Sequence, residues 1–255
     1  MKRPLLTALA VVATGTSVLA AVGAVRANTL RTEHRIVTMG AARSVDVHLR
    51  IGAGRLQVAG GAPTLMDAYF RYSRDDWRPE VRYAVRAGHG RLTVRQPSTN
   101  NVANSTSIQV GNSITIQNGT NIQNDWNVRL NSHVPLGLSI EEGAGTSSLL
   151  LGGLSLTGLD VKLGAGDTTL NLAGNWLHSF DATVRAGVGQ LTIVLPGRVG
   201  ARVTIQHGLG AIIGEIEANG LRQDGDHSYV NSAYGSSPVT VNVTIEHGVG
   251  TIVLE

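Results

Sequence analysis

Apolar and polar residues alternate along most of the chain, and the alternation changes phase at a Gly-x-Gly element that occurs seven times. An aliphatic residue stands three positions before the first glycine of every copy: Leu49, Val85, Ile140, Val161, Val184, Ile205 and Ile245. After the second glycine, the apolar residues fall mostly four and six positions past the first. A period of two is typical of a β-strand with one buried face. No stretch of the body after residue 27 shows a sustained helical period, so the pattern predicts an all-β fold.

The glycines are predicted to be structural. One extra residue in a strand reverses the faces of all later side chains, so each pair must absorb that reversal at a bulge or corner. Glycine suits such a point because it tolerates positive φ and close backbone approach. The fourteen glycines are Gly52, Gly54, Gly88, Gly90, Gly143, Gly145, Gly164, Gly166, Gly187, Gly189, Gly208, Gly210, Gly248 and Gly250.

The spacing of the copies favours a β-solenoid of stacked coils with Gly-x-Gly corners. Three successive intervals are 21, 23 and 21 residues, which is the self-similarity of a repeat architecture. A β-sandwich would explain the alternation but not the shared register. A dinucleotide-binding loop is disfavoured because a strand, not a helix, follows each pair. A calcium-binding roll is disfavoured because only Asp167 supplies a carboxylate after the second glycine.

The N-terminus predicts export. Lys2 and Arg3 precede an uncharged stretch from 4 to 25, and Ala27 ends a signal-peptidase-like sequence. Residues 1–27 are therefore expected to form a signal peptide or a membrane-anchor helix. The remainder would lie in the periplasm, at the cell surface or outside the cell, and would meet the membrane only through residues 4–25 if they are retained.

Charge and composition exclude several classes of protein. Three of the 21 basic residues lie in the leader, which leaves 18 to balance 18 acidic residues. Such a neutral body lacks the field that gathers nucleic acid. The absence of cysteine excludes disulfides and thiolate metal sites. No catalytic motif and no cofactor-binding motif is present, so we expect neither an enzyme nor a cofactor.

Three stretches resemble the bacterial toast-rack proteins, which are similar in turn to the C-terminal region of LiaF-type cell-wall antibiotic-response proteins. They are Ile51–Ala62 with Leu65 and Trp77–Pro79; Trp126–Asn131 with Val134–Leu138; and the tandem Glu142–Gly145, Leu163–Gly166 and Arg185–Gly189 with Leu149–Leu159. The resemblance implies a stacked β architecture in the bacterial envelope without established catalytic residues. It also implies a part in sensing cell-wall stress, although one possible anchor departs from the LiaF pattern of several spans.

Composition divides the body into three expected segments. Residues 28–96 would form N-terminal β units with an aromatic cap, and residues 126–255 would form the solenoid repeats. Between them, residues 97–125 contain seven Asn and three Gln and predict a linker or an extra hairpin around Gly111-Asn112; glycan contact is the alternative. The aromatic residues that either cap the first coil or bind a sugar or protein are Tyr69, Tyr72, Trp77 and Tyr83.

Histidines and acids elsewhere suggest weaker hypotheses. His207 and His247 precede the first glycine of their copies, so they would form a ladder if those coils are neighbours. Asp224–His227 could hold a cation, but short Asp/Gly runs are ordinary turns, and no metal site is predicted.

The sequence therefore predicts an exported, non-catalytic interaction or scaffold protein whose partner is an envelope protein or a cell-wall glycan. One alternative is a glycan-binding, adhesin-like module. Another is a β-helix carbohydrate-active enzyme, for which the candidate residues are Asp160, Lys162, Asp167 and Arg185.

Overall fold

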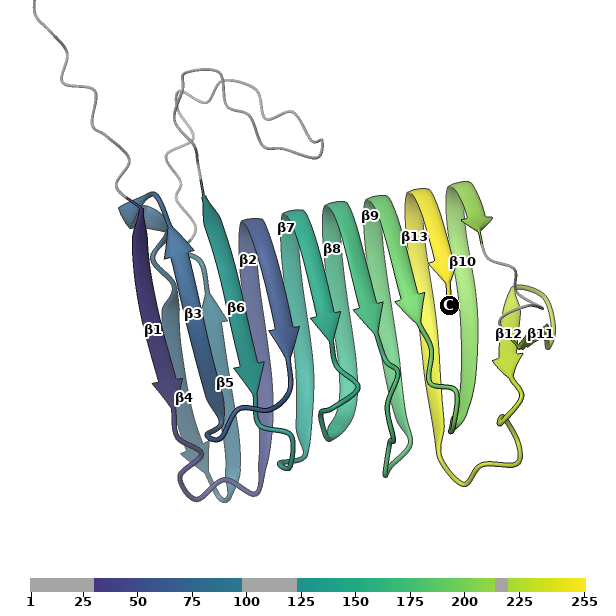
Figure 1. Cartoon of the computed structure of the whole chain (residues 1–255), viewed down its shortest axis with the longest axis horizontal. Coiled ribbons are helices and arrows are strands. Elements are labelled where there is room, and N and C mark those ends of the chain that lie inside the picture. The colour runs from purple at the N-terminus through teal and green to yellow at the C-terminus, as the bar shows by residue number, and fades with distance from the viewer. Residues whose placement is uncertain (1–29, 98–122, 214–219) are drawn as a thin grey trace, which may run out of the picture.

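The computed structural model describes residues 30–97, 123–213 and 220–255, and the strands in these ranges form one continuous sheet (Figure 1). The strands are β1 (Arg31–Val37), β2 (Ser44–Ala59), β3 (Met66–Tyr72), β4 (Glu80–Arg86), β5 (His89–Arg95), β6 (Asn124–Leu130), β7 (Leu136–Leu150), β8 (Leu156–Asn171), β9 (Phe180–Val194), β10 (Gly200–Ile213), β11 (Leu221–Gln223), β12 (Ser228–Asn231) and β13 (Thr240–Leu254). The single helix of these ranges is the short 3-10 turn η1 (Asp75–Trp77). Within the described ranges, no helix has the length and apolar character that crossing a bilayer requires. The predicted leader helix lies outside them.

Six long strands form parallel arches stacked in the order β2-β7-β8-β9-β13-β10. Each rises along one side, bends at its Gly-x-Gly element and descends on the other side (Figure 1). We call the part before the bend the back limb and the part after it the front limb, which faces the viewer in Figure 1. The predicted aliphatic column is buried between the limbs: Leu49, Ile140, Val161, Val184, Ile245 and Ile205 are each at most 1% exposed.

Close approach of the neighbouring arch requires glycine at both positions of a corner, and backbone conformation requires it at the second as well. The second glycine has a positive φ, for example 134° at Gly166, which side-chain-bearing residues rarely adopt. The first glycine has an ordinary φ but lies against the next arch: a Cβ on Gly164 would stand 2.1 Å from the carbonyl oxygen of Gly143. Stacked arches therefore approach one another at the corner more closely than any side chain permits.

The copy at Gly88 is not a corner, contrary to the prediction. Ala87 and Gly88 have φ values of 49° and 79°, which makes them the two central residues of a tight hairpin turn. This turn joins β4 to β5 in antiparallel pairing. The chain folds back on itself here, so the apolar residues on either side of the glycines lie on two neighbouring strands and not on one bent strand.

The N-terminal end is made of short antiparallel strands that continue both limbs of the first arch. On the front side, β6 pairs with the front limb of β2, β3 pairs with β6, and β1 forms the edge. On the back side, β5 pairs with the back limb of β2, and β4 pairs with β5. Phe70 and Trp126, both at most 1% exposed, fill the space between with ring centroids 5.2 Å apart at 81°.

The C-terminal end departs from the simple succession of coils that the repeat predicts. The last strand, β13, inserts between β9 and β10 and pairs with both in parallel. The β11–β12 hairpin pairs with the other side of β10 over Arg202–Thr204. Spatial order and chain order therefore differ here, because the chain passes one position and later returns to fill it. This insertion brings the backbones of His207 and His247 into register as neighbours.

Candidate functional site

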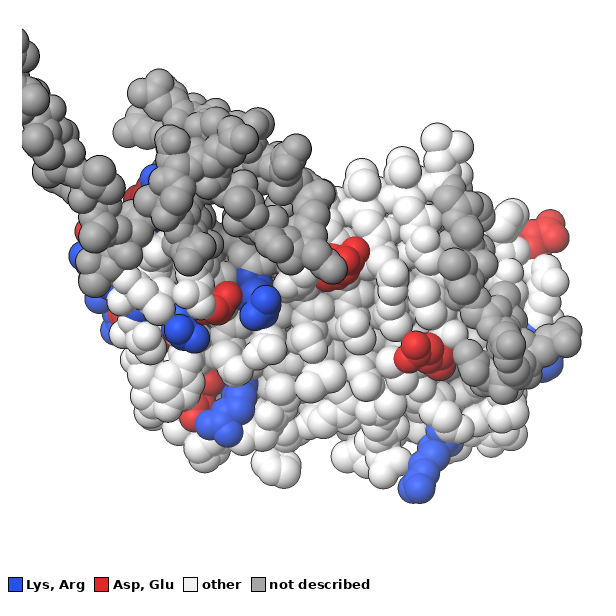
Figure 2. All heavy atoms as spheres, turned by 45° about the horizontal axis from the view of Figure 1, so that its top comes forward, with Lys and Arg blue, Asp and Glu red and all other residues white. Residues whose placement is uncertain are grey.

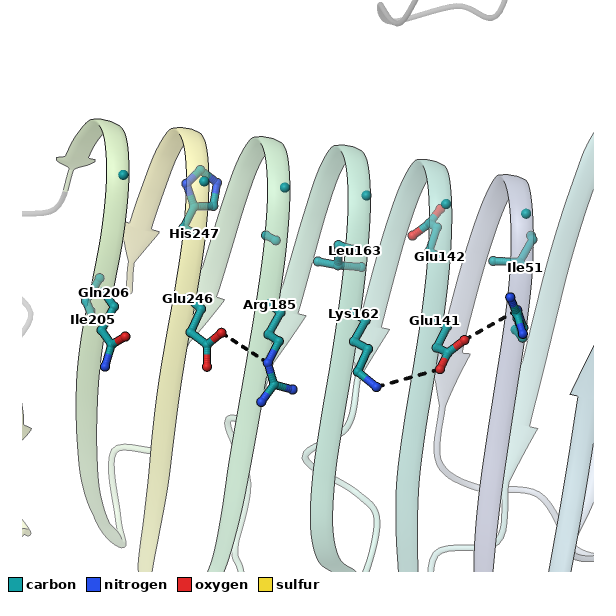
Figure 3. A pocket seen from close by; sticks show the side chains of 18 of the residues that line it. Ile51, Glu141, Glu142, Lys162, Leu163, Arg185, Ile205, Gln206, Glu246 and His247 are labelled. Carbon is teal, nitrogen blue, oxygen red and sulfur yellow. Dashed lines mark hydrogen bonds and ion pairs between the residues drawn. The ribbon is translucent and has the colours of Figure 1, made fainter.

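A groove of about 1200 Å³ crosses all six arches on the back limb, just below the corners (Figure 3). Its origin follows from strand alternation. The first glycine of each corner carries no side chain, whereas the outward residue two positions earlier is long and polar, as at Arg50 and Glu141. A row of missing side chains beside a row of long ones produces a trough. We call it the crest groove.

The long residues form a charged ladder along the crest groove (Figure 3). In spatial order they are Arg50, Glu141, Lys162, Arg185, Glu246 and Gln206. Nitrogen–oxygen distances are 3.5 Å from Arg50 to Glu141, 3.9 Å from Lys162 to Glu141 and 3.2 Å from Arg185 to Glu246.

Asp160, two positions before Lys162, completes the charged ladder. It accepts from Arg185 at 3.2 Å and lies 3.5 Å from the Lys162 ammonium. Three cations and three anions therefore alternate in one chain of contacts that carries no net charge. Their side chains are 41–67% exposed, and pairs this exposed add little to stability. What they supply is a row of hydrogen-bonding groups that a partner can reach.

The most unusual residue beside the crest groove is Glu142. It is only 6% exposed, and its backbone neighbours across the stack are Ile51 and Leu163. The Ser147 hydroxyl, on the opposite limb of the same arch, donates to its carboxylate. The other oxygen, Oε1, has no hydrogen-bond partner among the described residues. Burial therefore raises the pKa of Glu142 to about 7, and the Ser147 hydrogen bond only partly opposes this rise.

Sequence reasoning missed Glu142, although a signal was present. The position just before the first glycine is Ile51, Leu163 and Ala186 in other arches, so a carboxylate there interrupts an apolar inward column. His247 occupies the same column in β13 and is 5% exposed.

The structure separates the four residues considered for catalysis. Asp160, Lys162 and Arg185 meet in the charged ladder, but Asp167 lies beyond the corner on the front limb, where its carboxylate accepts from the backbone N–H of Gln190 at 3.1 Å. No set of three or more histidine or acidic side chains gathers at metal-binding distance within 30–97, 123–213 and 220–255. In the Asp224–His227 segment, for which the sequence favours a turn over a cation site, Asp224 lies 3.4 Å from Arg202 and 3.7 Å from Arg222.

Three of the four predicted ligand-binding aromatics are occupied in packing at the N-terminal end. Tyr72 is 4% exposed and donates to Glu33 at 3.1 Å. Trp77 packs against the core beneath the Arg74 guanidinium. Tyr83 donates to the Met39 carbonyl at 2.7 Å. Tyr69 is different, because 46% of it is exposed on the front face.

A Ser-His-Asp relay on the back limb was also not anticipated. Ser44 and His89 are neighbours on β2 and β5, with 2.9 Å between Oγ and Nδ1, and His89 Nε2 lies 2.8 Å from Asp46. All three lie outside the crest groove, so the relay lacks that recess for a substrate. Its evident effect is to link two strands.

The predicted insertion at 97–125 falls largely outside the described residues, including the proposed Gly111-Asn112 turn. Its end is described: β6 begins at Asn124, two residues before the predicted boundary. Asn124 is 3% exposed and donates to the Ala53 carbonyl at 2.6 Å, at the corner of the first arch.

Comparisons with known proteins identify the architecture. Residues 26–194 match the family model described as the N-terminal domain of toast_rack, DUF2154. The crystal structure of a candidate cell adhesion protein from Clostridium sporogenes is similar, with 28% identity and a TM-score of 0.76 over 89% of this chain and 99% of that chain. No curated protein matches the sequence.

Candidate adhesins of two other bacteria align far less well. One from Bacteroides fragilis is 12% identical with a TM-score of 0.20, over 89% of this chain and 97% of that chain. One from Parabacteroides distasonis is 11% identical with a TM-score of 0.26, over the same shares of the two chains. Scores this low carry no argument about function.

Proposed function

Because this chain belongs to the toast-rack family, we propose that it is an exported, non-catalytic adhesion module of the bacterial envelope that binds its partner in the crest groove. The observation that carries this proposal is the groove itself, which crosses six arches and is bordered by exposed, mutually neutralised charges. The similarity over nearly the whole length of a candidate cell adhesion protein supports it.

The geometry favours binding over turnover. The charged ladder is extended along the sheet, whereas a catalytic site gathers a nucleophile, a base and an oxyanion-stabilising group around one reacting atom. An extended surface on stiff strands suits an envelope protein partner that lies across several arches. Because the sequence resembles LiaF-type proteins, we also propose a role in the response to cell-wall stress.

The proposal also includes a β-solenoid architecture for the arches. We infer that arches β7 to β9, each joined to the next by a short connection from front limb to back limb, are successive coils of a β-solenoid. The N-terminal strands and the β11–β12 hairpin would then close its two ends, as capping units do in repeat proteins.

The test is retention of the purified exported chain on isolated bacterial envelopes. Lys162→Glu combined with Arg185→Glu reverses two cations of the charged ladder and is expected to lower retention at least about tenfold. Arg91→Glu combined with Arg198→Glu makes the same change in net charge at exposed positions outside the groove and should bind normally. Equal retention by the two double variants would refute the groove as the binding surface.

A further inference from the structure

The front face carries a row of uncharged polar side chains that runs straight across the stack. Paired residues of neighbouring strands place them side by side from β3 to β9. In spatial order the row is Tyr69, Asn127, Gln57, Ser148, Thr169 and Thr192. Neighbouring strands are about 4.8 Å apart, so six positions span about 24 Å. We call this row the front track.

The chemistry of the front track differs from that of the back limb. Its amides and hydroxyls can each donate and accept hydrogen bonds, and none carries a charge. The Asn127 side-chain amide donates to the side-chain oxygen Oε1 of Gln57 at 3.1 Å, which orients both amides. Charged side chains on this face gather toward the N-terminal end (Figure 2). There a paired row of Arg71, Asp125 and Arg55 runs beside the first half of the track, two residues away along each strand.

Tyr69 ends the front track with an aromatic ring in a fixed orientation. The His34 ring stacks on it with centroids 4.1 Å apart and planes within 3°. His34 is itself held by Asp67, 2.8 Å from its Nε2, and Asp67 accepts a further hydrogen bond from Arg129. Since His34 lies on β1 and covers one ring face, the other face is directed toward β6 and Asn127.

We propose that the front track binds a linear, uncharged glycan, whose hydroxyls meet the amide and hydroxyl side chains while a terminal sugar packs on Tyr69. The complementarity is chemical: a polyol offers donors and acceptors and no charge, as the track does. The row itself offers an anionic polymer no cation, and it offers a protein surface no apolar side chain except Tyr69. Leu150, which is 50% exposed, lies two residues beyond Ser148 and outside the row. The site is separate from the crest groove, but its biological sense rests on the proposed role at the envelope.

Titration calorimetry with three uncharged hexasaccharides tests the proposal: chitohexaose, cellohexaose and maltohexaose, each beside its disaccharide. At least one hexasaccharide should bind about tenfold more tightly than its disaccharide, because it reaches more of the track. Tyr69→Ala should weaken this binding at least about tenfold, and Tyr69→Phe should preserve it because the ring remains. Thr169→Val with Thr192→Val keeps side-chain shape but removes two hydroxyls, and should reduce the preference for the longer sugar.

Leu177→Ala is the matched control, since it removes an exposed apolar side chain, 80% accessible, from a loop away from the track. Failure of the wild-type chain to bind any of the three hexasaccharides would overturn the proposal. So would hexasaccharide binding that is unchanged in Tyr69→Ala and in the double valine variant. If envelope retention still depends on Lys162 and Arg185 in that case, the adhesion proposal stands and only the glycan track is lost.

Discussion

The N-terminal strands and the arches solve the same packing problem by different means. In β1 and β3 to β6, short strands pair antiparallel with one another around large side chains such as Phe70 and Trp126, and the chain turns back at the β4–β5 hairpin. In the arches, parallel strands bend through glycine corners over a narrow aliphatic interior. Large side chains fill the interior of the first region, whereas in the second the backbones of neighbouring arches lie close together at the glycine corners.

Polar groups also differ between the two regions. At the N-terminal end, Glu33 accepts from Tyr72 and Arg78 and also contacts Arg35, so its partly buried charge is satisfied. In the arches, Glu142 has one hydroxyl donor and an unpartnered oxygen among the described residues. Three experiments follow from this contrast, taken from the largest expected effect to the smallest.

Alanine at two positive-φ glycines should separate the regions most clearly. In Gly166→Ala the new Cβ would stand 1.8 Å from the Gly145 carbonyl oxygen of the next arch, whereas in Gly88→Ala it would meet nothing closer than 3.9 Å. We expect the arch variant to lose more than about 4 kcal/mol of unfolding free energy and the hairpin variant about 1–2 kcal/mol. Urea unfolding followed by circular dichroism measures both. Equal losses would mean that φ alone, and not arch spacing, explains the glycines.

The pH dependence of stability should reveal Glu142. Its folded pKa of about 7 lies above the ordinary value of 4.5, so its full contribution is present below pH 4.5 and is lost as pH rises through 7. This difference between the folded and the ordinary pKa corresponds to about 3 kcal/mol of unfolding free energy. Unfolding free energies at pH 5 and pH 8 should therefore differ less in Glu142→Gln than in the wild type. Glu141→Gln, its exposed neighbour in the charged ladder, serves as the control and should retain the wild-type difference.

Glu33 should show a smaller effect of opposite sign. The Arg78 hydrogen bond, more than any other contact, lowers the pKa of Glu33 despite its burial. Its contribution is therefore present above pH 4.5 and lost as pH falls through the lowered value. Glu33→Gln should cost about 1 kcal/mol at pH 7, and this cost should shrink progressively as the pH falls below 4.5. Lys162→Ala, which removes an exposed member of the charged ladder, should cost less than about 0.5 kcal/mol at pH 7. A Glu33→Gln penalty that persists undiminished at acid pH would contradict the ion-pair account.

The sequence predicted some residues of the candidate site but not their contacts. The outward residues Lys162 and Arg185 were recognisable as exposed charges on adjacent repeats, and Tyr69 as an aromatic candidate. The contacts of these residues could not be predicted. Asp160 contacts both Lys162 and Arg185, whereas Asp167 lies on the other side of a corner. Tyr72 is buried, whereas Tyr69 on the same strand is exposed. Single-residue patterns report which face a side chain takes but not which strand lies beside it.

The alternation of apolar residues and the glycine pairs by themselves determined the all-β class, the inward columns and most of the corners, because side-chain period and backbone φ are local properties of a strand. Only the tertiary structure decided that Gly88 begins a hairpin turn, that β13 enters between β9 and β10, and which residues share the crest groove and the front track. Those outcomes depend on pairing between segments far apart in the chain, where many registers satisfy the same local pattern and the packing of the whole stack selects one.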